Sequence, residues 1–224
     1  RFSPKSRALL GARGIGLKKY KKIIIVLVIL LLLVFGAFAY CKFFKSRPVD
    51  TPIKEVKVTN TIENYGYNLE DRDTKLYKDK YEKLKELLSK DDYDKDEYIK
   101  LISELFIIDL YTIDNKISRY DVGGTEFMYT GAVSSFKASV ENSLYKTVEN
   151  DLEDNRNQAL PVVSSIEITN YEPTTYEMPD QTVIDGYKVN LSWQYEKDLG
   201  YDDTGVLIVI PDGNKMGVVF YKAK

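Results

Sequence analysis

The chain of 224 residues contains no histidine and one cysteine, Cys41. The absence of histidine excludes Ser-His-Asp and Cys-His nucleophilic centres, as well as zinc sites built on histidine ligands. A single cysteine excludes an internal disulfide and a cysteine-cluster metal site. The sequence also lacks a glycine-rich loop of the kind that binds phosphates or dinucleotides. An enzyme made from this chain would therefore depend on carboxylates, tyrosine or lysine, and no motif identifies a reaction or a cofactor.

Acidic residues are absent from residues 1–47, which carry 11 lysine and arginine residues. Residues 48–224 carry 21 basic and 34 acidic residues, a net charge of −13. The near-neutral total of −2 therefore averages two parts of opposite charge. Because the larger part is acidic, it would repel nucleic acid, and we expect no nucleic-acid partner for it.

Residues 23–40 form an uninterrupted run of eighteen uncharged and mostly apolar residues. As a helix with a rise of about 1.5 Å per residue, this run would cross about 27 Å of hydrocarbon. Eight basic residues precede it and three follow closely. This difference favours a protein of the cell membrane in which residues 1–22 form a cytoplasmic tail and the residues after the span are extracytoplasmic. The basic tail would also contact anionic lipid.

Other readings of this region remain open. Residues 37–39 (Ala-Phe-Ala) fit the small-x-small pattern before a signal-peptidase site, so the protein would be secreted after cleavage near Ala39. Cys41 raises the alternative of lipoprotein processing, although Tyr40 directly before it does not suit that reaction. The basic tail is also compatible with nucleic-acid binding. An exported domain without disulfides is typical of a bacterial surface protein. A composition rich in lysine, asparagine, tyrosine and isoleucine and free of histidine is typical of low-GC Gram-positive or related bacteria.

After the span, the composition indicates a stalk and then one folded domain. Residues 41–69 contain Pro48, Pro52 and Gly66 and little helical periodicity, so we expect a stalk or linker with a short strand within 51–61. Residues 70–224 are long enough for a single extracytoplasmic domain with its own core.

The first part of this domain has helical periodicity. Apolar residues recur every three or four positions and predict helices over 74–89, 95–112 and 132–154. Asp71 and Asp73 are candidate N-caps of the first helix. Asp94 followed by Glu97 predicts the start of the second helix, whose wide apolar arc indicates a buried central helix. Residues 121–124 (Asp-Val-Gly-Gly) predict a tight turn with a positive φ at a glycine.

After Pro161 the period changes from helical to alternating. Four strands are predicted, over residues 162–171, 182–195, 205–210 and 216–222. Residues 211–214 (Pro-Asp-Gly-Asn) predict a hairpin turn between the last two, and residues 199–203 join the two before. Helices followed by consecutive strands predict an α+β fold, with three helices packed on a curved antiparallel sheet of about four strands.

A basic tail, one span, a stalk, three helices and an antiparallel sheet together resemble one known layout. It is that of VirB8/TcpC-type components of conjugation and type IV secretion machines, whose exported domains are NTF2-like (cystatin-like). The resemblance implies oligomerisation and contacts with neighbouring membrane proteins, and it carries no site residues over. Residues 106–116 followed by 121–124 are also similar to a segment of uncharacterised membrane-anchored proteins of low-GC Gram-positive bacteria, which implies no function.

Asp92, Asp94 and Asp96 stand at alternate positions, as at the start of an EF-hand calcium loop. A loop beginning at Asp92 requires glycine at its sixth position and glutamate at its twelfth, where this chain has Glu97 and Ser103. We therefore interpret these aspartates as a solvated turn that caps a helix, and we predict no metal site.

Five residues are candidates for a pocket or a binding face. A carboxylate within an apolar helix would have a raised pKa and could act as a general acid or base, although helix capping or a bond to tyrosine explains it equally well. Exposed tyrosines offer a large contact area at low entropic cost, although packing is their usual role. The candidates are Asp109, Tyr111, Tyr187, Trp193 and Tyr201.

Two hypotheses of function follow. The first is a non-catalytic interaction or assembly module at the envelope, which predicts a filled interior and an exposed apolar or tyrosine-rich patch. The second is an extracytoplasmic enzyme or small-ligand binder. It predicts a deep cavity between helices and sheet, with convergent polar groups that include Asp109, Tyr111 or Trp193.

Overall fold

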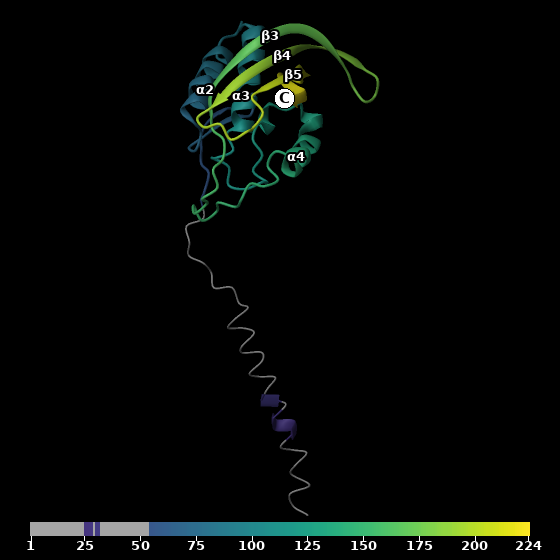
Figure 1. The fold of residues 1–224 in the computed structure, drawn as a ribbon. Coiled ribbons are helices and arrows are strands. Elements are labelled where there is room, and N and C mark those ends of the chain that lie inside the picture. Colours follow the sequence, from purple (N-terminus) through teal and green to yellow (C-terminus); the bar gives the residue numbers. More distant parts are fainter. Residues whose placement is uncertain (1–24, 29, 32–53) are drawn as a thin grey trace, which may run out of the picture. The chain divides into compact units, whose positions relative to one another are not determined.

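The computed structural model of the protein describes residues 25–28, 30, 31 and 54–224 (Figure 1). Residues 25–28, 30 and 31 are helical. The remainder of the predicted span, the basic tail over 1–22 and the first part of the predicted stalk lie outside the described residues. Within the described part, no helix has both the length and the apolar character needed to cross a membrane. The chain divides after residue 51 into two units, and the fold below is that of the second.

Residues 54–224 form an α+β unit in which three helices pack against a four-stranded antiparallel sheet (Figure 1). The predicted fold class is confirmed at this level. In chain order the elements are β1 (Val58–Ile62), β2 (Tyr67–Glu70), α2 (Lys75–Leu88), α3 (Lys95–Tyr111), the 3₁₀ helices η1 (Thr125–Phe127) and η2 (Thr130–Ala132), α4 (Val133–Asn142), β3 (Val163–Glu177), β4 (Val183–Tyr195), β5 (Thr204–Asp212) and β6 (Lys215–Ala223).

Strands β1 and β2 form an antiparallel hairpin where the sequence predicts a stalk. Gly66 closes its turn with φ +70°. Tyr67 is fully buried, and its ring stacks on Phe127 with 5.0 Å between centroids. Residues 54–69 therefore belong to the folded unit, which begins before the expected boundary at residue 70. The short strand predicted within 51–61 overlaps β1, which begins at Val58. Strand β2 has four residues, too few to show periodicity, so only its packing against the core identifies it.

Helix α2 agrees with the predicted range, but its N-cap differs. The cap is Thr74, whose hydroxyl accepts the N–H of Tyr77 at 3.3 Å. Of the two predicted caps, Asp73 instead accepts the N–H of Glu70 at 2.6 Å, just before the helix. The hydroxyl of Thr74 and the carboxylate of Asp73 are both suitable N-cap groups. Thr74 is the cap because the carboxylate of Asp73 is already bonded to Glu70.

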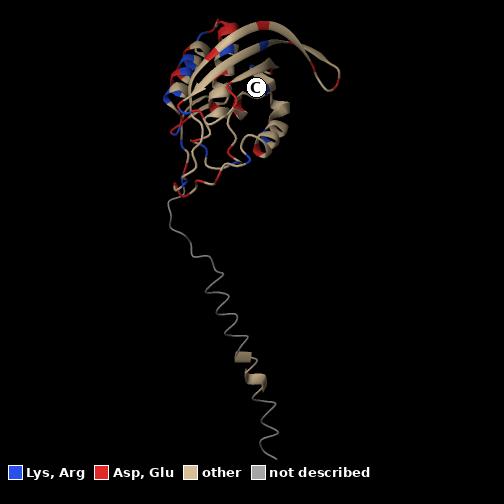
Figure 2. Ribbon diagram, viewed as in Figure 1, with Lys and Arg blue, Asp and Glu red and all other residues tan. Residues whose placement is uncertain are grey.

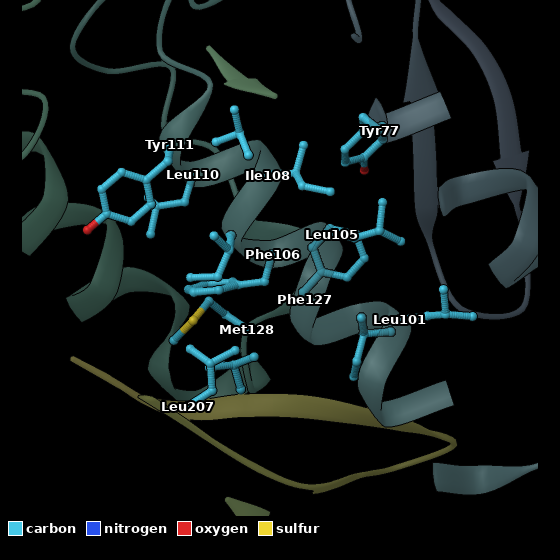
Figure 3. Packing of buried hydrophobic residues seen from close by; sticks show 14 of the residues in the cluster. Tyr77, Leu101, Leu105, Phe106, Ile108, Leu110, Tyr111, Phe127, Met128 and Leu207 are labelled. Atoms are coloured by element: carbon cyan, nitrogen blue, oxygen red, sulfur yellow. The ribbon is translucent and has the colours of Figure 1, made fainter. Parts of the chain in front are cut away.

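Helix α3 is the buried central helix that the sequence predicts. Asp94 caps it by accepting the N–H groups of Asp96 at 2.8 Å and Glu97 at 3.2 Å. Twelve of its residues are buried, so the helix is enclosed on nearly all sides. In Figure 3, its Phe106 lies above Met128, which in turn lies above Leu207 of the sheet. The space between this helix and the sheet is thus filled by apolar side chains.

Helix α4 is shorter than predicted, because it ends at Asn142 rather than near residue 154. The side chains of Asn142 and Ser143 donate to the carbonyls four residues earlier, each at 2.7 Å. Such bonds compete with continuation of the helix. The chain then turns so that Tyr145 is fully buried and its hydroxyl donates to the carbonyl of Leu110 at 2.8 Å. This tertiary contact overrides the helical periodicity.

The four predicted strands are confirmed and lie in the order β3-β4-β5-β6. Gly213 has φ +64° in the β5–β6 turn, and Gly200 has φ +75° between β4 and β5. Strand β3 runs to Glu177, six residues past its predicted end at Tyr171. Its continuation passes through Pro173, which an edge strand tolerates because its outer side needs no N–H donor.

Beyond the sheet, β3 and β4 continue as a two-stranded extension. Strand β5 pairs with β4 only from Tyr187 to Ser192, whereas β3 pairs with β4 as far as Glu177 and Val183. Residues 175–185, here named the β3–β4 arm, therefore have no third strand paired with them, whereas Gly186 at the base of the arm already lies against Val209 of β5. Figure 1 shows the arm curving away from the sheet to a tip well clear of the helices.

Candidate functional site

A small polar pocket of about 110 Å³ lies between the β1–β2 hairpin, α3 and the turn before η1. It combines five carboxylates with two cations and several smaller groups. Its lining residues are Asn68, Glu70, Arg72, Asp73, Tyr77, Asp109, Lys116, Asp121, Val122, Gly123, Thr125 and Glu126.

Asp109 joins α3 to the 121–124 turn at one wall of this pocket. Its carboxylate accepts the N–H of Gly124 at 2.6 Å and forms an ion pair with Lys116, whose side chain is only 2% exposed. Gly124 has φ +76°, which confirms the predicted positive φ in this turn. A Cβ on Gly123 would lie 2.1 Å from the carbonyl oxygen of Asp109, so only glycine allows this approach.

Arg72 forms the opposite wall and holds two acidic residues. Its guanidinium donates to Glu70 at 2.7 Å, to Asp121 at 3.1 Å and to the carbonyl of Asn115 at 3.1 Å. Burial raises the pKa of the Asp121 carboxyl, but hydrogen bonding and charge attraction from Arg72 outweigh it and lower that pKa overall. The ion pair therefore ties the end of β2 to the loop after α3.

Asp73 and Glu126 are the two pocket carboxyls without a cation partner among the described residues. Burial is the largest cause of their shifts: it raises the pKa of Asp73 to about 6 and that of Glu126 to about 7, despite the N–H groups that each accepts. Glu126 accepts the N–H of Asn68 at 2.9 Å. Both groups therefore exchange protons close to neutral pH, which general acid–base chemistry requires.

The size of the pocket argues against a substrate site. Ligand pockets usually measure roughly 300–1,000 Å³, and this one is about 110 Å³. Five of its seven charged groups are already paired within the protein. Within residues 54–224 and the short N-terminal helix, no group of histidine, cysteine, aspartate and glutamate is arranged to hold a metal ion. The pocket is better explained as a network of hydrogen bonds and ion pairs that holds the β1–β2 hairpin against α3.

A second and larger hollow, here named the α4–β6 groove, runs between α4 and the last residues of β6 and has a volume of about 550 Å³. Phe136, Val140 and Leu144 line it from the α4 side, together with the hydroxyls of Ser135 and Ser139. At its floor, the hydroxyls of Tyr111 and Tyr221 bond to each other. Its remaining lining residues are Met128, Ala132, Ser143, Asp202, Val219, Phe220, Lys222 and Ala223.

The groove runs along an unpaired edge of the sheet. Strand β6 is the last strand, and between residues 54 and 224 its only backbone bond on the outer side is from Tyr129 N–H to the carbonyl of Val218, at 2.9 Å. The N–H of Lys224 donates to Thr204 of β5 at 2.9 Å. Because alternate residues of an antiparallel strand face its partner, the backbone groups of Tyr221 and Ala223 point away from the sheet.

The predicted site residues do not come together. Asp109 lies in the polar pocket and Tyr111 lines the α4–β6 groove. Trp193 is 3% exposed and packs on the ring of Tyr111 with 4.8 Å between centroids, so it helps to fill the interior. The three side chains therefore share neither the polar pocket nor the groove.

The other two candidates lie elsewhere on the sheet. Tyr187 stacks on Tyr171 with 5.3 Å between ring centroids, below the ammonium of Lys95. Tyr201 packs beside Tyr195 with 6.4 Å between centroids. Neither residue lines the pocket or the groove.

Sequence reasoning missed both the raised pKa of Glu126 and the groove. Glu126 lies in η1 just after a glycine pair, and no local pattern in the sequence predicts its contact with Asn68 of the hairpin, which is 58 residues earlier. The groove has a weak signal: Phe136, Val140 and Leu144 follow one another at four-residue spacing beside serines at the same spacing. This stripe predicts that the helix has an apolar face. It does not predict that part of this face remains uncovered in the fold.

No protein-family model, no curated protein and no solved structure matches this chain.

Proposed function

We propose that this chain is a single-pass, membrane-anchored extracytoplasmic interaction or assembly module that binds protein through the α4–β6 groove. The observation that carries the proposal is the unpaired β6 edge beside an apolar helix face. An extended segment of a partner would add a strand to this edge and satisfy its backbone groups, while Phe136 and Val140 provide apolar contacts. This is a common mode of peptide recognition on sheets.

The membrane part of the proposal is supported by residues 1–40. The basic tail and the uncharged run favour an anchor with its N-terminus in the cytoplasm. The order of three helices followed by a four-stranded antiparallel sheet supports an NTF2-like layout. A conjugation- or secretion-type envelope complex is the setting that this layout suggests.

A binding module accounts for the interior better than an enzyme does. Trp193 and Tyr111 fill the space between α3 and the sheet, where a catalytic cavity is expected in the alternative hypothesis. The carboxyls with raised pKa values lie in a pocket of about 110 Å³. The second candidate function is small-ligand binding in the α4–β6 groove, because its volume of about 550 Å³ is in the range of ligand pockets.

Site-specific photocrosslinking in intact cells tests the docking surface. A photoreactive residue replaces Ser139, which is exposed and lines the groove, and the matched control replaces Ser134, which is exposed on the same helix outside the groove. We expect a protein adduct at Ser139 that is absent at Ser134. Equal yields at both positions, or no protein adduct at Ser139, would overturn the proposed docking surface.

Protease treatment tests the topology of the full chain. Protease added to wall-stripped cells should remove residues 54–224 and leave the tail protected. A domain that is cleaved only after lysis contradicts the proposed orientation. A domain found in the medium, with a new N-terminus near residue 40, supports the secreted alternative instead.

A further inference from the structure

The outer edge of strand β2 is bonded to side chains. Within residues 54–224, β2 pairs with β1 alone. The N–H of Asn68 donates to the carboxyl of Glu126 at 2.9 Å, and the N–H of Glu70 donates to the carboxyl of Asp73 at 2.6 Å. The carbonyl of Asn68 accepts the hydroxyl of Tyr77 at 3.4 Å. Because alternate N–H groups of a strand point to the same side, the two carboxyls together hold the side of β2 that faces away from β1.

These two carboxyls are also the ones without a cation partner in the polar pocket. When both are ionised, five carboxylates stand against the two cations Arg72 and Lys116, a net charge of −3. When both hold protons, three carboxylates stand against the same two cations, a net charge of −1. A pocket of about 110 Å³ holds only a few water molecules. The added charges are therefore poorly hydrated while the hairpin covers them.

Side chains of every neighbouring element face the two carboxyls. The charged and titratable ones are Tyr67 and Glu70 in β2, Arg72 after it, Tyr77 and Tyr81 in α2, Asp109 in α3, Lys116 and Asp121 in the loop after α3, and Lys215 in β6. Burial raises the pKa of both carboxyls, and the negative charges of Asp109 and Glu70 raise it further. Lys215 donates to the backbone carbonyl of Glu126 at 3.3 Å, not to its carboxyl.

We propose that Glu126 and Asp73 form a proton-dependent clasp on β2, which holds the β1–β2 hairpin firmly when both carboxyls are protonated and lets it open more readily when they are ionised. An ionised carboxyl is a good acceptor for an N–H group, but the closed hairpin keeps its charge from water, and opening hydrates it. The ring of Tyr67 is buried against Phe127 and opposes opening. The clasp therefore changes how often the hairpin opens locally, while the rest of the domain stays folded.

The direction of the pH dependence follows from the open state. When the hairpin opens, the two carboxyls regain ordinary pKa values, 3.8 for Asp73 and 4.5 for Glu126. In the closed state these pKa values are about 6 and about 7. Between these limits the closed hairpin holds protons that the open hairpin has released. Closure therefore weakens as the pH rises from about 4 to 7 and changes little above this window.

Amide hydrogen exchange of the full chain in detergent micelles, measured by mass spectrometry at pH 5 and pH 8, tests the clasp. Dividing each rate by that of the unfolded chain at the same pH removes the chemical pH dependence of exchange. We expect the protection of residues 58–70 to fall about ten-fold or more between the two pH values. We also expect it to lie below the protection of β4 at both pH values, as local opening requires.

Two double variants assign the effect to the clasp. Asp73→Asn with Glu126→Gln removes both charges, so the protection of the hairpin should be nearly the same at pH 5 and pH 8. The matched control, Asp79→Asn with Glu86→Gln, changes two exposed carboxyls of α2, where acidic residues alternate with lysines (Figure 2). It should lose protection as the wild type does.

The fluorescence of Trp193, the one tryptophan of the chain, checks that each variant is folded. If the first double variant fails this check, Glu126→Gln alone should show a several-fold smaller loss of protection than the wild type. Constant protection of the wild-type hairpin, or an equal loss in wild type and variant, overturns the clasp. Equal protection of the hairpin and β4 at both pH values also overturns it, because the hairpin then opens only when the whole domain unfolds. The clasp does not involve the α4–β6 groove, so it and the proposed function can fail separately.

Discussion

Glu126 shows how a fold changes the chemistry of one side chain. In the polar pocket, burial raises the pKa of its carboxyl from an ordinary value of 4.5 to about 7. Between these two pH values the folded state holds a proton that the unfolded state has released. Stability therefore falls as the pH rises through this window and changes little above it. Asp73, with a pKa of about 6, contributes in the same direction.

The substitution Glu126→Gln tests this description. Glutamine keeps an acceptor for the N–H of Asn68 but has no charge to bury. We expect the variant to exceed the wild type in free energy of unfolding by about 1–3 kcal/mol at pH 8, and to show no such gain near pH 4. Urea unfolding followed by Trp193 fluorescence measures both. The control is Glu86→Gln, at an exposed position; an equal gain in the control, or an unchanged pH profile, would contradict the role of burial.

At the scale of elements, the 121–124 turn connects the polar pocket to the central helix. Gly123 lies against the backbone of Asp109, and the same aspartate binds Gly124 and Lys116. The turn is therefore held by α3 as much as by its own conformation. The β1–β2 turn differs, because Gly66 has a positive φ but no atom within 4 Å of an added Cβ.

Alanine substitutions at these two glycines separate close packing from backbone conformation. Gly66→Ala should cost about 1–2 kcal/mol, the usual penalty for a left-handed residue with a side chain. Gly123→Ala should cost about 3 kcal/mol or more, because its Cβ meets backbone that cannot move independently. Urea midpoints of the two variants and the wild type give the comparison. A smaller loss for Gly123→Ala than for Gly66→Ala would mean that the turn can move away from α3.

At the scale of the whole molecule, charge separates the chain into a basic segment of +11 over residues 1–47 and an acidic remainder of −13. Because eight basic residues precede the uncharged run and three follow it, protease added to wall-stripped cells should remove residues 54–224 and leave the basic tail protected.

Sequence by itself determined the elements whose patterns are local: helices α2 and α3, the four strands of the sheet, and the turns at Gly124, Gly200 and Gly213. Periodicity and turn chemistry act over a few residues, so they can be read without the fold. Tertiary structure decided what depends on distant residues meeting. It ended α4 at Asn142 because Tyr145 bonds to Leu110. It formed the hairpin over the core and raised the pKa of Glu126, and it left the β6 edge open beside α4, because burial and exposure belong to the packed chain and not to any segment of it.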